Sequence, residues 1–168
     1  MVIKAIPTTY RNIEYRSKLE ANWAEWLYNH GFNTQYEKRK FKLERNIWYL
    51  PDFYIPETKT FIEVKGNLER LHKPFQLVQE LKRECPETWP DGGTMLLLAG
   101  PKIGAFYNIE QPYYMGLKVI HCKNCNVSSI ITEYGSQKCR YCGSKDWNST
   151  EPIPVSQKPL KWLLLERD

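Results

Sequence analysis

The chain has 168 residues, 42% of them hydrophobic and 14% aromatic, a composition that excludes a wholly disordered protein and allows one domain plus a small module. Its formal net charge of +5 permits a polyanionic partner without requiring one. No apolar run is long enough to span a bilayer, and the N-terminus lacks the apolar core of a signal peptide. We therefore expect a cytoplasmic protein with no membrane partner.

A first helix is predicted over residues 15–30, and Gly31 ends it. Four apolar side chains repeat at the spacing of one helical face: Leu19, Trp23, Trp26 and Leu27. With about 100° between successive residues, Glu20 lies at the edge of this apolar stripe. Glu20 is therefore the acid of this helix that is expected to face a partly buried site.

Three strands are predicted next, over residues 33–44, 47–55 and 60–65, from their alternation of apolar and polar side chains. Residues 56–59 separate the last two and predict a tight hairpin turn. In the first strand, three lysines share one face and are candidate contacts for nucleic-acid phosphates: Lys38, Lys40 and Lys42. An exposed strand face kept soluble by lysines is the alternative.

A second helix over residues 73–84 and a buried strand over 94–99 follow. The apolar face expected for this helix consists of Phe75, Val78 and Leu81. Lys73 and Gln76 are candidate nucleic-acid contacts, with an ordinary solvated helix face as the alternative. The order helix, three strands, helix, strand predicts an α/β fold around a mixed sheet, and residues 100–117 are expected to form an aromatic-rich loop with one short strand.

The segment YLPDFYIPETKTFIEVKG, residues 49–66, holds the residues most suggestive of chemistry. Strand alternation puts Glu63 and Lys65 on one face, and a hairpin between the two strands would bring Asp52 to Glu63. Two carboxylates and a lysine are what Mg²⁺-dependent phosphodiester hydrolysis needs, because the carboxylates bind the metal and the lysine polarises a water. A simple Glu63–Lys65 surface pair is the alternative.

On Pro51-Asp52 and Glu63-Val64-Lys65, residues 15–66 resemble the PD-(D/E)XK nuclease superfamily. Within it, the stretches YRSKLEANWAEWL, YLPDFYIP and FIEVKG are similar to small nucleases of bacteriophages and mobile elements. The resemblance implies a restriction-endonuclease-like core. It also implies Mg²⁺ or Mn²⁺ held by Asp52, Glu63 and the Val64 carbonyl, an attacking water oriented by Lys65, and Glu20 as an acid supplied from the first helix.

The activity predicted in this way is a Mg²⁺-dependent endonuclease that hydrolyses phosphodiester bonds in DNA. Two alternatives stay open: a non-catalytic nucleic-acid-binding or regulatory protein on a nuclease scaffold, and a structure-specific or RNA nuclease. Cutting of both strands would favour a homodimer, because one site cuts one strand at a time. For a phage-encoded protein, the expected location is the cytoplasm of the bacterial host.

Four of the five cysteines form two C-x-x-C pairs separated by 13 residues: Cys122, Cys125, Cys139 and Cys142. Without a secretion signal, this pattern favours metal over disulfides, and four thiolates suit tetrahedral Zn²⁺ in a structural site. It resembles a zinc ribbon in which residues 126–138 form a β-hairpin. An iron–sulfur cluster or two redox pairs are alternatives without a supporting feature. Cys85 is expected to be a buried or idle thiol rather than a ligand.

The cysteine module carries three further candidate nucleic-acid contacts, Lys123, Arg140 and Tyr141. A purely structural or protein-binding module is the alternative. The chain is thus predicted to have three parts: a nuclease core over 1–118, a zinc ribbon over 119–148, and a linker with a C-terminal segment that docks on the core over 149–168.

Overall fold

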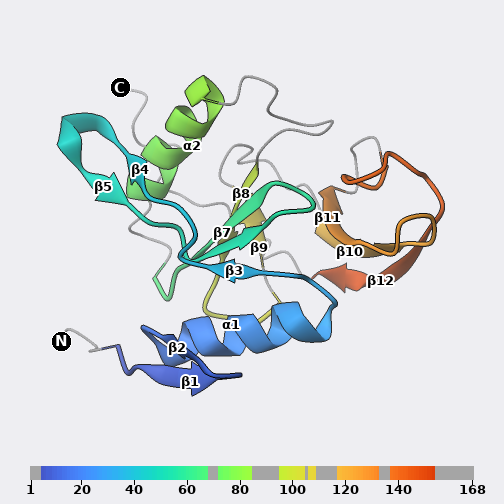
Figure 1. Ribbon diagram of the computed structural model, residues 1–168, viewed down its shortest axis with the longest axis horizontal. Coiled ribbons are helices and arrows are strands. Elements are labelled where there is room, and N and C mark those ends of the chain that lie inside the picture. Colours follow the sequence, from blue (N-terminus) through green and yellow to red (C-terminus); the bar gives the residue numbers. More distant parts are fainter. Residues whose placement is uncertain are drawn as a thin grey trace.

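A computed structural model of the chain describes residues 5–67, 72–84, 95–104, 106–108, 117–132 and 137–153. A central sheet lies between two helices, and a smaller sheet adjoins it at one end (Figure 1). The predicted segment near the C-terminus and Cys85 lie outside the described residues. Neither helix of the described part is long and apolar enough to cross a membrane.

The central sheet has the strand order β3-β6-β7-β8-β9. Its strands are β3 (Gln35–Tyr36), β6 (Phe53–Ile55), β7 (Thr60–Val64), β8 (Met95–Ala99) and β9 (Phe106–Asn108). Strands β7 and β8 are parallel, whereas the other neighbours are antiparallel. Helix α2 (His72–Glu84) connects β7 to β8, as a parallel pair requires. The predicted mixed α/β sheet is therefore confirmed.

Helix α1 (Lys18–Asn29) packs on one face of this sheet. It begins after Ser17, whose Oγ accepts a hydrogen bond from the Glu20 N–H at 3.2 Å, which satisfies a free donor of the first turn. Trp23 and Leu27 are fully buried against sheet residues that include Ile62. The predicted helical face is confirmed. The helix starts later than predicted because residues 13–15 form β2 (Ile13–Tyr15), which pairs with β1 (Thr8–Tyr10).

Helix α2 covers the opposite face of the sheet. Leu77, Val78 and Leu81 pack with Phe61 and other side chains of β7 and β8. Because neighbouring strand residues face opposite sides, Phe61 contacts the α2 layer while Ile62 contacts the α1 layer. The expectation that Phe75 joins the buried face is wrong: Phe75 is exposed, and the face runs through Leu77 at the helical spacing i, i+1, i+4 with Val78 and Leu81.

The first two predicted strands are each broken in the structure. Glu37 takes a positive φ of 49° directly after β3, a conformation that L-residues rarely adopt and that cannot continue a strand. The chain resumes as a separate hairpin of β4 (Phe41–Lys42) and β5 (Trp48–Tyr49) around a 3₁₀ turn (Glu44–Asn46). This β4–β5 hairpin is a sheet of its own (Figure 1), although Phe41 packs against Phe61 of β7. The lysines 38, 40 and 42 therefore do not share one continuous strand face.

The cysteine module is built on a second, antiparallel sheet of order β11-β10-β12. Its strands are β10 (Leu117–Cys122), β11 (Ser128–Thr132) and β12 (Trp147–Ile153). Of residues 126–138 the structure describes 126–132 and 137–138, and it places one strand there, β11, which pairs with β10. The predicted hairpin lies partly outside the described residues and stays a prediction. The first residues of the predicted linker, 149–153, belong to β12. This sheet therefore extends beyond residues 119–148 on both sides.

The smaller sheet shares a hydrophobic core with α1. Val119 and Ile130 belong to the same buried cluster as Trp23. Two polar contacts reinforce the junction: Ser128 Oγ donates to the His30 carbonyl at 2.8 Å, and Arg140 Nη2 donates to the Thr58 carbonyl at 3.3 Å. The module is consequently packed onto the central unit rather than tethered to it.

Candidate functional site

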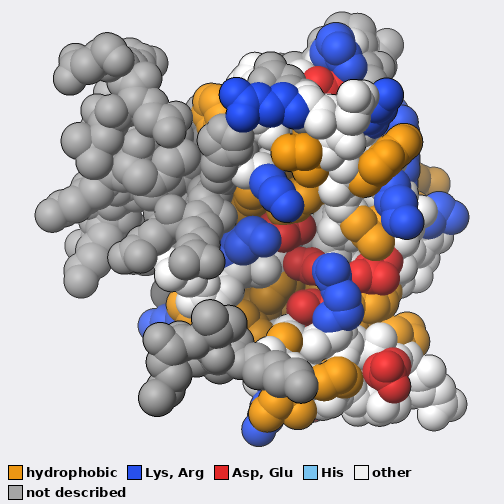
Figure 2. Space-filling model, turned by 90° about the vertical axis from the view of Figure 1, so that its left-hand side faces the viewer, with side chains coloured by type: hydrophobic (Ala, Val, Ile, Leu, Met, Phe, Trp, Pro, Cys, Tyr) orange, Lys and Arg blue, Asp and Glu red, His pale blue; other side chains and the backbone are white. Residues whose placement is uncertain are grey.

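Four carboxylates from separate segments gather around one arginine at an edge of the central sheet. We call these carboxylates the acid cluster: Glu20, Glu37, Asp52 and Glu63. A group of acidic side chains lies in the middle of one face of the molecule, with Lys and Arg side chains around it (Figure 2). This combination of buried acids and a basic surround is where the chemistry of the described residues is concentrated.

The pairing of β6 with β7 brings Asp52 and Glu63 together. Phe53 lies opposite Ile62 in this antiparallel pair, so the next position in the same register sets Asp52 across from Glu63. The Val64 N–H donates to Asp52 Oδ2 at 2.7 Å, which holds the carboxylate in this position. The structure therefore brings together the two acids that the sequence predicted to converge.

Both acids are almost completely buried: Asp52 is 2% exposed and Glu63 4%. Burial, reinforced by the nearby Glu63 charge, raises the pKa of Asp52 to about 8. Burial also raises the pKa of Glu63, and the Lys65 ammonium opposes that shift. Two like charges in a dry site disfavour ionisation, so this pair favours binding of a cation over standing as two free carboxylates.

Glu63 has one satisfied and one unsatisfied oxygen. Its Oε1 pairs with Lys65 Nζ, whereas its buried Oε2 has no hydrogen-bond partner among the described residues. The Tyr49 hydroxyl is also buried without a hydrogen bond of regular geometry, but it lies next to the Glu63 carboxyl group; burial, the Glu63 charge and this contact raise the pKa of Tyr49. An orphaned carboxylate oxygen beside a second buried acid is a donor set that suits a hard divalent cation such as Mg²⁺. The residues present therefore fit such an ion.

Glu20 lies in the acid cluster, as the helical spacing predicted. Its Oε2 accepts a hydrogen bond from the Tyr36 hydroxyl at 2.6 Å, and its Oε1 accepts one from Ser17 Oγ at 2.9 Å. These donors orient the carboxylate from α1 and β3. Val64 ends β7 beside the two acids, and a contribution of its carbonyl to metal binding stays a prediction.

Sequence reasoning missed Arg16 and Glu37. Arg16 Nη2 lies 2.6 Å from Asp52 Oδ1, and Arg16 Nε lies 2.8 Å from Glu37 Oε1. The spacing of Arg16 and Glu20, four residues apart, was an available signal of an ion pair. The contacts to Asp52 and Glu37 depend on the tertiary fold and have no such local signal.

The candidate nucleic-acid contacts differ in how they are placed. Five of them are exposed cations or aromatics outside the sheets' buried faces: Lys38, Lys40, Lys73, Lys123 and Tyr141. Lys42 is exposed on β4, whereas Gln76 is half-buried and its Oε1 has no described partner. Arg140 is half-buried and its guanidinium contacts the Thr58 carbonyl, a position that favours joining the module to the central unit.

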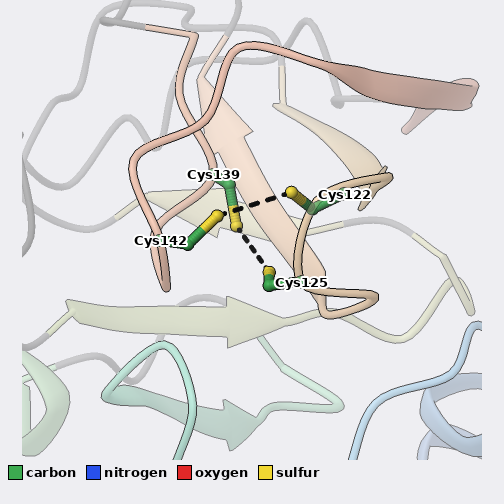
Figure 3. A group of neighbouring side chains, drawn as sticks. All are labelled: Cys122, Cys125, Cys139 and Cys142. Atoms are coloured by element: carbon green, nitrogen blue, oxygen red, sulfur yellow. Dashed lines mark hydrogen bonds between the residues drawn. The ribbon is translucent and has the colours of Figure 1, made fainter.

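The four cysteines predicted to bind metal are grouped in space (Figure 3). Their Sγ atoms all lie within 4.8 Å of one another, and two of the separations, Cys122–Cys142 and Cys125–Cys139, are 3.6 Å. Four sulfurs bonded to a tetrahedral Zn²⁺ at about 2.3 Å would stand about 3.8 Å apart. The thiols are therefore positioned to bind a metal ion such as Zn²⁺, which confirms this prediction at the level of geometry.

Two tight turns create this arrangement. Asn126 and Gly143 both have positive φ, and their N–H groups donate to the carbonyls of Cys122 and Cys139. A Cβ on Gly143 would meet nothing within 4 Å, so the left-handed conformation rather than crowding favours glycine there. Asn124 Nδ2 donates to Cys142 Sγ at 3.5 Å, and such hydrogen bonds lower the pKa of the Cys142 thiol to about 6.

The raised pKa of Asp52 has a consequence for stability. Because its folded-state pKa of about 8 exceeds the unfolded value, the native state binds more protons through this window. In the zinc-loaded protein without added Mg²⁺ or Mn²⁺, this group should therefore make the free energy of unfolding fall as pH rises from about 5 to 8. Asp52→Asn should flatten this slope. Between about pH 5 and pH 8, the free energy of unfolding of the variant should fall by at least about 1 kcal/mol less than that of the unmodified protein.

Urea unfolding at pH 5.5 and pH 8 measures this effect. Glu25→Gln is the matched control, because Glu25 is an exposed acid of α1 and should leave the slope unchanged. A slope that is identical in Asp52→Asn and the unmodified protein would contradict the prediction.

Comparison of this chain with protein-family models, with curated proteins and with solved structures finds no match.

Proposed function

We propose that this protein is a Mg²⁺-dependent endonuclease that hydrolyses phosphodiester bonds in DNA, and that its four-cysteine centre holds a structural Zn²⁺. The observation that carries the proposal is the buried Asp52–Glu63 pair, with one unpartnered carboxylate oxygen and Lys65 beside it. Two buried acids with a carboxylate oxygen that has no hydrogen bond of regular geometry are more typical of a metal-dependent active site than of a structural ion pair. The PD-(D/E)XK motif in the sequence supports the same reading.

In this proposal Asp52 and Glu63, with the Val64 carbonyl, hold Mg²⁺ or Mn²⁺. The ion would lower the pKa of a water and offset the negative charge that develops on the phosphate. Lys65 Nζ is held by Glu63 and remains partly exposed, so it is placed to contact a phosphate oxygen or the attacking water as a point charge. Glu20, oriented by Ser17 and Tyr36, would keep the site acidic from the α1 side.

The surround of the acid cluster supports a polyanionic substrate. The segment that leads into the β4–β5 hairpin and the hairpin itself carry exposed cationic side chains: Lys38, Arg39, Lys40, Lys42 and Arg45. The same hairpin contributes Tyr49, which lies under Lys65, with Lys65 Nζ 5.9 Å from the ring centroid. A nucleic acid drawn to this basic hairpin would therefore pass next to the proposed active site.

Trp48 gives this surface a second kind of contact. It is 62% exposed on β5, beside the buried Tyr49, so strand alternation directs the two rings to opposite sides. Stacking of a base on an aromatic side chain is worth about 1–3 kcal/mol. Trp48→Ala is therefore expected to weaken nucleic-acid binding about tenfold.

Fluorescence anisotropy of a labelled oligonucleotide, with the zinc-loaded protein and no added Mg²⁺ or Mn²⁺, measures this affinity without cleavage. Tyr28→Ala is the control, since Tyr28 is an exposed aromatic on α1 outside the hairpin. Equal losses of affinity in the two variants, or none in Trp48→Ala, would argue against a stacking role for Trp48.

The activity itself is tested on plasmid DNA, single-stranded DNA and RNA, each with Mg²⁺, Mn²⁺ or EDTA. We expect cleavage of DNA that requires a divalent ion and stops in EDTA. The absence of metal-dependent cleavage on every substrate would reject the enzyme and leave nucleic-acid binding to be judged separately. Preference for RNA would keep the chemistry and correct the substrate. Metal analysis should find about one zinc per chain.

A further inference from the structure

Arg16 lies where a metal ion would compete with it. Its guanidinium contacts three members of the acid cluster: Nη2 is 2.6 Å from Asp52 Oδ1, and Nε is 2.8 Å from Glu37 Oε1 and 3.8 Å from Glu20 Oε2. Asp52 Oδ1 is thus occupied by a side-chain cation, while Asp52 Oδ2 accepts from the Val64 N–H. Any ion that binds Asp52 through Oδ1 must share or replace the Arg16 contact.

The acid cluster has more carboxyl groups than cationic partners. Its four carboxyl groups share two cationic side chains in the described contacts, Arg16 and Lys65. The oxygen left over is Glu63 Oε2, which is buried without a described hydrogen-bond partner. A divalent cation can balance two carboxylates where one guanidinium balances one, so such an ion would satisfy this group of acids more completely than Arg16 does.

The two partners of this ion pair differ in their freedom to move. The Arg16 side chain is 57% exposed, whereas that of Asp52 is 4% exposed. The Arg16 backbone is held in place, because its N–H donates to the Tyr36 hydroxyl at 3.1 Å. A guanidinium cannot lose its charge by deprotonation. Another cation can therefore replace it at Asp52 only if the Arg16 side chain rotates away toward solvent, and its exposure leaves room for that rotation.

We propose that Arg16 is an exchangeable counter-cation of the acid cluster: it pairs with Asp52 Oδ1 when no divalent ion is bound, and it gives up this oxygen when one binds. The inference rests on the divalent-ion site of the proposed function, but it does not require that the bound ion hydrolyse anything. It adds Arg16 to the site. It also explains how the protein can fold around buried acids before a metal ion binds, because Arg16 supplies a positive charge next to them.

The proposal predicts that removing the guanidinium makes metal binding tighter. A cation that must first displace a charge-assisted hydrogen bond binds more weakly than one that meets a free carboxylate. With the Arg16 contacts partly screened by solvent, Arg16→Gln should tighten Mn²⁺ binding about fivefold to tenfold. A residue that merely held Asp52 in position would have the opposite effect, because its loss would disorder a ligand.

Mn²⁺ binding to the zinc-loaded protein, without nucleic acid, is measured by electron paramagnetic resonance of the free ion. Arg11→Gln is the matched control: it removes the same charge from an arginine whose guanidinium lies over the Tyr28 ring, 3.8 Å from its centroid. Its affinity should equal that of the unmodified protein. Asp52→Asn should lose most binding. In melting experiments on the zinc-loaded protein, Arg16→Gln should be less stable without added Mn²⁺ and gain more from Mn²⁺.

Mn²⁺ affinity that is unchanged or weaker in Arg16→Gln would overturn the proposal, and so would an absence of Mn²⁺ binding in both proteins. The nuclease assay is a separate readout. Tighter Mn²⁺ binding in Arg16→Gln without cleavage of any substrate would support the exchange and reject the proposed hydrolysis. Metal-dependent cleavage without tighter binding would keep the hydrolysis and reject the exchange.

Discussion

Lys65→Met is expected to lower the rate of metal-dependent DNA cleavage at least about a hundredfold, the usual effect of removing one electrostatic stabiliser from an active site. Methionine keeps the length and apolar stem of lysine but has no charge. Lys65 Nζ pairs with Glu63 Oε1 and lies over the Tyr49 ring, so its loss removes the only described cation that contacts Glu63. The rate should therefore fall without loss of the fold.

Single-turnover cleavage of supercoiled plasmid at saturating Mg²⁺ measures the chemical step in this variant. Lys59→Met is the matched control: Lys59 is an exposed lysine just before β7, whereas Lys65 follows its other end. The control should cleave at the normal rate and bind DNA similarly. Undiminished cleavage in Lys65→Met would reject the assignment of the site, and equal losses in both variants would point to a general effect of positive charge.

The parts of this fold that could be predicted from sequence depend on short-range periodicity. The apolar stripe of α1 repeats over the whole helix, and the alternation around Glu63 determines which side chains face each helix layer. The meeting of Asp52 with Glu63 followed from one assumption, that their strands form a hairpin. That assumption was sufficient because a hairpin with a short turn has its register set by the turn.

The parts that could not be predicted depend on single backbone conformations and on distant partners. The left-handed conformation of Glu37 separates β3 from β4, although the alternating pattern of residues 33–44 continues through it. Strand β11 pairs with β10, a strand outside the loop between the cysteine pairs, and alternation alone does not identify a strand's partner. Arg16 joins the acid cluster through contacts 21 and 36 residues away in sequence, which local patterns do not report.

The second large effect concerns the cysteine centre. Cys139→Ser is expected to destabilise the whole chain, with a fall in melting temperature of more than about 10 °C. Cys139 is buried with Ile120 and Ile131 in the cluster beside the metal-binding thiols. On the other face of β10, Val119 packs into the core of α1. Val119 and Ile120 are neighbours on β10, and they pack in the α1 core and in the cysteine cluster respectively. Loss of the metal site should therefore loosen the α1 core as well.

Thermal unfolding, followed by far-ultraviolet circular dichroism and by tryptophan fluorescence, measures whether the two clusters unfold together. Cys85→Ser, which alters the cysteine outside the two C-x-x-C pairs, is the control and should keep both the zinc and the melting temperature. Two separate transitions, with the helical one unchanged in Cys139→Ser, would show that the cysteine module folds independently.

A single shared transition would also connect the metal centre to the acid cluster. Helix α1 supplies Glu20 to that cluster, and Ser128 of the smaller sheet donates to the His30 carbonyl at the other end of the helix. Removing Zn²⁺ should therefore displace α1 and weaken Mn²⁺ binding at Asp52, although the two sites share no ligand. Zinc returned to the chelated protein should restore Mn²⁺ affinity and melting temperature together, whereas recovery of one without the other would separate the two sites.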